Sequence, residues 1–168
     1  MSLQTRLEAL VAAIGADIKK IRATDWTEEI RSTAYNNSTV TASDVFTGFT
    51  PLANSRYLVD ITASVASAAT GTGIQAALAG PTSGVAIAAV KIVSAASASA
   101  DMVSHSGLNT FQVALGAPAT ANLLTVQAIL QMASPIGAGN VRLQLRSEVA
   151  GSAITCHAGS IMRWRQIG

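Results

Sequence analysis

The stretch RYLVDITASVAS, residues 56–67, decides the fold class of this chain. Successive side chains of a β-strand point to opposite faces, so a strict alternation of apolar and polar residues indicates a strand with one buried face. The apolar face here carries Tyr57, Val59, Ile61, Ala63 and Val65. This pattern predicts a long strand that contributes one face to a hydrophobic core.

Short apolar runs continue on both sides of this strand, separated by Gly, Pro, Ser and Asn. They predict roughly nine strands in all, with no helical pattern between them. Phe46 and Phe49 provide the first large side chains for the core. We therefore expect an antiparallel β-sandwich of jelly-roll type over residues 25–168, although periodicity does not give the strand order. Ten segments are candidates for these strands: residues 29–35, 45–52, 56–67, 74–78, 85–93, 111–115, 123–132, 141–148, 154–157 and 160–167.

Residues 1–24 follow a different period and predict an α-helix. Leu7, Ile14 and Ile21 fall at heptad position a, and Leu3, Leu10 and Asp17 fall at position d. Apolar residues at a and d are typical of helices that pack against copies of themselves, and Asp17 places one polar residue in that seam. The sequence thus predicts an oligomerisation stalk over residues 1–24. Two alternatives stay open: an amphipathic helix lying on its own domain, and an oligomer other than a trimer.

The composition favours a thin, weakly charged domain. Hydrophobic residues make up 49% of the chain but aromatic residues only 4%, so Ala and Val fill much of the expected core. Charged residues make up 12%, about half of the usual share in globular proteins. Association of subunits would bury part of this weakly polar surface and so reduce its exposure to water.

The charge distribution does not favour nucleic acid as a partner. The formal net charge is only +2, and several basic residues lie in the helical segment. Those of the body alternate along expected strands and do not form a dense patch interleaved with aromatic residues. They are Arg142, Arg146, Arg163 and Arg165.

No membrane insertion or secretion is expected from the sequence. The longest low-charge stretch, residues 61–90, is interrupted by glycines and Pro81, and a membrane span needs about 20 continuous apolar residues. Arg6, Glu8 and Asp17 interrupt the apolar N-terminus, so we expect no signal peptide. Cys156 is the single cysteine, which excludes a disulfide within the chain.

Residues that could carry chemistry are few and poorly placed. Asp101, Ser104 and His105 are the residue types of a hydrolytic triad, but they lie within one short segment that we expect to be a loop. Cys156 and His157 are adjacent and would point to opposite faces of a strand, so they would not chelate one metal ion. We expect no catalytic residue, no metal site and no cofactor. Trp26 and Trp164 are expected to pack and not to bind a sugar.

The helical segment LQTRLEALVAAIGADIK, residues 3–19, resembles a short helix common in structural proteins of tailed bacteriophages, where it precedes a fibre or receptor-binding β-domain. The body is similar to small phage β-domains in four stretches: STAYNNST at residues 32–39, RYLVD at 56–60, SEVAGS at 147–152 and GSIMR at 159–163. The resemblance implies a trimeric fibre, spike or decoration module on the head or tail of a phage or phage-like particle. A short trimeric coiled coil would form its base, and three jelly rolls would be displayed outward.

The leading hypothesis is therefore a noncatalytic virion structural protein that mediates attachment or decorates the capsid or tail. It would be made in the host cytoplasm and reside in the virion. Its partners would be two further copies of itself, other head or tail proteins, and a host-surface glycan or receptor. Residues 94–107 are the candidate loop at the tip of the body.

The alternative is a carbohydrate-binding β-sandwich module that works as a monomer or as an appendage to an enzyme. A polysaccharide depolymerase ranks last, because it needs paired carboxylates in a cleft. The acidic residues of the body that could form such a pair are scattered singly along the sequence: Asp44, Asp60, Asp101 and Glu148.

Overall fold

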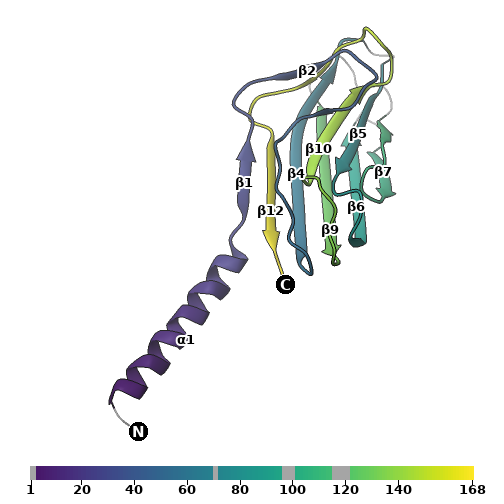
Figure 1. Ribbon diagram of the computed structural model, residues 1–168. Coiled ribbons are helices and arrows are strands. Elements are labelled where there is room, and N and C mark those ends of the chain that lie inside the picture. Colours follow the sequence, from purple (N-terminus) through teal and green to yellow (C-terminus); the bar gives the residue numbers. More distant parts are fainter. Residues whose placement is uncertain (1–2, 70–71, 96–100, 115–121) are drawn as a thin grey trace.

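A computed structural model describes residues 3–69, 72–95, 101–114 and 122–168 of the chain. It begins with one helix, α1 (Leu3–Thr24), and continues as strands. The helix is rich in Ala and Leu, which have high helix propensity, and two residues separate its end from the first strand. Figure 1 shows α1 projecting away from the β-structured body, from the end of the body where the C-terminus also lies.

The larger of two antiparallel sheets contains the longest strands of the body. Its strand order is β1, β12, β4, β9, β6, β7, and the short strands β2 and β11 extend it where β11 pairs with both β2 and β4. The strands are β1 (Thr27–Ile30), β2 (Tyr35–Asn37), β4 (Arg56–Ser67), β6 (Val85–Ala95), β7 (Asp101–Ser106), β9 (Asn122–Met132), β11 (Ile154–Cys156) and β12 (Ile161–Gln166).

The smaller sheet has the order β3, β10, β5, β8. Its strands are β3 (Ser43–Asp44), β5 (Ile74–Ala79), β8 (Gln112–Ala114) and β10 (Arg142–Ser147). In Figure 1, β10 and β5 lie in front of β4, β9 and β6. The expectation of a mainly β, antiparallel chain with an N-terminal helix is confirmed.

The hydrophobic core is built from side chains of both sheets. Ile61 of β4 and Leu130 of β9 are completely buried, as are Leu78 of β5 and Leu143 of β10, and all four belong to one cluster. The alternation predicted for residues 56–67 is confirmed, since the five apolar side chains of that face are all buried. The same holds for β10, where Leu143, Leu145 and Ser147 are buried and the residues between them are partly exposed.

The strand expected at residues 45–52 is wrong. This segment contains no named strand, and only Phe49 makes a single bridge, to Val141. Gly48 adopts a φ of +69°, and a Cβ there would overlap the carbonyl oxygen of Val141, so the chain turns sharply at this glycine. Phe46 and Phe49 are nevertheless buried, as expected from their size.

The loop expected at residues 94–107 is also wrong in part. Strand β6 extends to Ala95, and β7 (Asp101–Ser106) pairs with it as a hairpin arm, while residues 96–100 lie outside the described residues. Asp101, Ser104 and His105 therefore lie on a strand. The described part of the chain has more strands than the roughly nine expected, because strands as short as β2 and β3 leave no periodic signal.

Candidate functional site

An apolar surface on α1 is the first candidate for a functional site. Leu7 is 59% exposed, Leu10 57%, Val11 63% and Ile14 49%. Residues three, four and seven positions apart lie on one side of a helix, so these four side chains form one stripe. We refer to Leu7, Leu10, Val11 and Ile14 as the helix stripe.

The helix stripe includes three of the residues predicted for oligomerisation, Leu7, Leu10 and Ile14. Leu3, Asp17 and Ile21 lie within α1, but their side chains are outside the described part of the structure. Val11 was not predicted, because it falls at heptad position e. The helix does not bury this stripe on its own domain, so the alternative of a helix lying on the body is wrong for these residues.

The junction between α1 and the body is held by cation–π contacts. The guanidinium groups of Arg163 and Arg165 lie 5.0 and 5.1 Å from the ring centroid of Trp26. Backbone pairing of Thr27 with Trp164 then joins β1 to β12 directly after the helix. These contacts fix the point at which the helix leaves the body.

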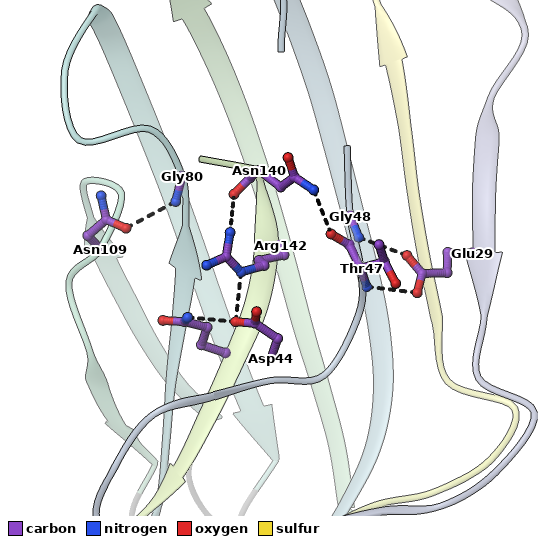
Figure 2. A network of polar contacts seen from close by, with 9 residues as sticks. Glu29, Asp44, Thr47, Gly48, Gly80, Asn109, Asn140 and Arg142 are labelled. Atoms are coloured by element: carbon purple, nitrogen blue, oxygen red, sulfur yellow. Dashed lines mark hydrogen bonds and ion pairs between the residues drawn. The ribbon is translucent and has the colours of Figure 1, made fainter. Parts of the chain in front are cut away.

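A polar network ties β1 to the small sheet (Figure 2). The two carboxylate oxygens of Glu29 accept the backbone N–H groups of Thr47 and Gly48 at 2.8 and 2.9 Å. The Asn140 side chain donates to the carbonyl of Thr47 at 3.2 Å, and Arg142 forms an ion pair of 2.7 Å with Asp44. Each carboxylate is engaged by a donor within the chain, and the two bonds of Glu29 support the turn at Gly48.

An aromatic cavity of about 800 Å³ lies at the helix end of the body. Trp164 of β12, Tyr57 of β4 and Phe49 line it, together with Asp25 from the link after α1. The Phe49 ring stacks on Trp164 with centroids 5.0 Å apart and planes at 13°. The expected packing role of Trp164 is thus confirmed, but sequence analysis missed the cavity, because its wall comes from residues over 100 positions apart.

Of the remaining sequence candidates, the structure describes the side chain of Cys156, whereas those of Asp101, Ser104 and His105 lie outside the described part of the chain. Cys156 is completely buried and contacts Ser160, with Sγ and Oγ 3.3 Å apart. Burial raises the pKa of the Cys156 thiol, an effect that the Ser160 hydrogen bond and the charge of Arg31 oppose. Among the described residues, no group of three or more His, Cys, Asp or Glu side chains is placed to hold a metal ion. The described part of the chain also contains no helix with the length and apolar character needed to cross a membrane.

No protein-family model and no curated protein matches this chain. The resemblance to phage structural proteins therefore stays a prediction.

Proposed function

We propose that this chain is a noncatalytic virion structural protein: a trimeric fibre, spike or decoration module on the head or tail of a phage or phage-like particle. The observation that carries this proposal is the helix stripe, an apolar surface on a helix that projects from a folded body. A helix of 22 residues is about 33 Å long, and most of the stability of a helix in a protein comes from the packing of its apolar face. Association of copies along the stripe would bury its apolar side chains and stabilise the helix.

A trimeric coiled coil is the state that we propose for α1. Leu7 and Ile14 at position a and Leu10 at position d form a mixed Leu and Ile seam. The family resemblance selects the trimer among the states that such a seam allows. A carbohydrate-binding module that works as a monomer would leave the helix stripe in water, so we rank it second.

The strand order supports a β-sandwich of jelly-roll type. In a jelly roll, the first, eighth, third and sixth strands form one sheet, and the second, seventh, fourth and fifth form the other. We treat β2, β6, β7 and β11 as additions to this scheme, and count the other eight described strands in chain order: β1, β3, β4, β5, β8, β9, β10 and β12. The large sheet then has the order first, eighth, third, sixth (β1, β12, β4, β9). The small sheet has the order second, seventh, fourth, fifth (β3, β10, β5, β8). Both orders agree with the jelly-roll scheme, which recurs in viral capsid proteins and in lectins.

Several charged groups of the body are paired within the chain, which agrees with a structural role. Asp60 pairs with Arg163 at 2.6 Å and Asp44 with Arg142 at 2.7 Å. Arg146 lies over the Phe111 ring, 4.3 Å from its centroid. These groups satisfy one another on the surface of the body. We propose other head or tail proteins as further partners and the virion as the location.

Fractionation of purified particles from the producing cells tests this function. An antibody raised against the chain is applied to density-gradient fractions and, in immunogold microscopy, to intact particles. We expect the chain in the particle fraction and gold label at one position on the head, neck or tail. A chain that stays at the top of the gradient and labels no particle would contradict the proposal.

A further inference from the structure

The large sheet carries a row of apolar side chains on the face that is turned away from the core. Successive side chains of a strand point to opposite faces, so Leu58 lies on this outer face while its neighbours in β4 are buried. Ile129 of β9 is directly opposite Leu58 on one side and Ala89 of β6 on the other. Ile129 and Ile87, which precedes Ala89 on the same face of β6, are each 53% exposed. We refer to Leu58, Ile87, Ala89 and Ile129 as the sheet patch.

The outer face of the small sheet has a different character. Arg142, Gln144 and Arg146 of β10 alternate with its buried residues and contact the polar side chains of Asp44 and Gln75. An antiparallel sheet that covers the core with one face usually turns such polar side chains to water on the other. The small sheet follows this rule and the sheet patch does not, which indicates that the patch is covered in the assembled protein.

The sheet patch lies on the same face as the link between α1 and the body. Arg165 of β12 is directly opposite Leu58. The guanidinium of Arg165 lies 5.1 Å from the ring centroid of Trp26, and Trp26 is the second residue after α1. The row that starts at the end of α1 therefore continues through β12 into the sheet patch.

Association along the helix stripe would bring a second copy to this face. The helices of a cyclic trimer run parallel, and packed helices lie about 8–10 Å apart. Trp26 follows the end of α1 by two residues, which span at most about 7 Å, so the Trp26 residues of two copies would lie within about 25 Å of each other. The outer face of the sheet beside Trp26 would then be close to the neighbouring body.

The charges around the sheet patch are complementary between copies. Arg56 and Arg165 flank Leu58, whereas Asp25 and Glu28 are exposed at the edge of the sheet where α1 joins β1. In a cyclic trimer, different surfaces of neighbouring copies meet, so the acidic edge of one copy can face the basic flank of the next. A uniformly acidic partner would meet the like charges of Asp25 and Glu28, and a uniformly basic partner those of the arginines. A second copy of the chain avoids both.

We propose that the sheet patch is the surface on which the body of a second copy packs. This proposal rests on the proposed function, since association along α1 brings the copies together, and it adds a contact between the bodies. Packing removes the exposed side chains of Ile87 and Ile129 from water. The rim charges select the partner and contribute little to stability.

Cysteine labelling of the full-length chain tests the proposal. Ile129→Cys places a thiol in the sheet patch, and Val149→Cys places one at a side chain of similar exposure, 48%, in the loop between β10 and β11. That loop is hydrogen-bonded to the end of β4, from the N–H of Ala68 to the carbonyl of Ala153 at 2.8 Å, whereas Leu58 lies near the start of β4. We expect a bulky maleimide to label Ile129→Cys about tenfold or more slowly than Val149→Cys. The unmodified chain, in which Cys156 is completely buried, gives the background rate.

A monomeric background separates cover by a second copy from cover within the chain. Leu10→Asp, a change within the helix stripe, is combined with each cysteine variant, and light scattering verifies the monomeric mass. We expect Ile129→Cys to be labelled as rapidly as Val149→Cys in this background, because a monomer leaves the sheet patch in water. Circular dichroism checks that the body is folded in all variants.

Equal labelling rates of the two cysteine variants in chains of trimeric mass would overturn this proposal and leave the proposed function intact. Slow labelling of Ile129→Cys that persists in the monomeric background would also overturn it, because the patch would then be covered within one chain. A monomeric mass of the unmodified chain would overturn both proposals together.

Discussion

Glu29 joins strand β1 to the turn at Thr47 and Gly48 through both of its carboxylate oxygens. We expect Glu29→Ala to lower the free energy of unfolding by about 1–2 kcal/mol, because two backbone donors lose a charged acceptor. Glu28→Ala is the matched control, since Glu28 is the preceding, exposed residue of β1, and it should change stability by less than about 0.5 kcal/mol. Urea unfolding monitored by circular dichroism measures both. Equal losses would show that Glu29 does not hold the turn.

Cys156 should be chemically inert in the folded chain. The thiol is completely buried and burial raises its pKa, so the reactive thiolate is scarce at neutral pH. A thiol-specific disulfide reagent should leave native protein unmodified at pH 7 and label one thiol per chain in denaturant. Rapid labelling of the native protein would contradict the burial.

The sign of the pH effect follows from the direction of this shift. The folded chain holds the Cys156 proton more tightly than the unfolded chain does. The contribution of this thiol to the free energy of unfolding is therefore fully present at neutral pH. As the pH rises above the ordinary thiol range of about 8.5, the unfolded chain loses its proton first and the stability falls. The protein should therefore be less stable at alkaline pH, and a Cys156→Ala variant should lose less stability over the same range.

Single positions were predictable where side-chain alternation and burial coincide, as at Ile61 and Leu143. The turn at Gly48 was not, because a positive φ depends on the carbonyl of Val141, a residue distant in sequence. The cavity beside Trp164 escaped prediction for the same reason. Residues that line it from β4 and β12 meet only through strand pairing, such as Tyr57 with Gln166.

At the scale of elements, α1 makes the sharpest prediction. Leu10→Asp introduces a charge into the helix stripe and should convert the proposed trimer into monomers. Ala12→Asp introduces the same charge at heptad position f of the same helix and should leave the native mass unchanged. Light scattering after size-exclusion chromatography measures both, and circular dichroism reports whether the body remains folded. If both variants keep the native mass of the unmodified chain, the helix stripe is not the site of association.

Long elements could be predicted from the sequence, whereas short ones could not. The bounds expected for residues 56–67 agree with β4, and those for 123–132 begin one residue after the start of β9. Both strands are long enough for several alternations, so the period of two is clear. Strand β3 has two residues and β2 has three, which is too short to show any period. These strands are set by pairing with β10 and β11.

At the scale of the whole molecule, the mainly β character with an N-terminal helix could be predicted, but the order of strands could not. Neighbours such as β1 and β12 lie at opposite ends of the body sequence. Their pairing depends on which apolar faces meet in the core, and the alternation within each strand says nothing about its neighbour. The polar network of Figure 2 also depends on this arrangement, since Glu29, Thr47 and Asn140 come from three separate segments.

The native mass of the full-length chain, measured by size-exclusion chromatography with light scattering, tests the central claim most directly. We expect a mass three times that of the 17.1 kDa chain, because association along the helix stripe removes its exposed apolar side chains from water. A mass of 17.1 kDa at micromolar concentrations, or a mass of two chains, would contradict the trimeric fibre, spike or decoration module.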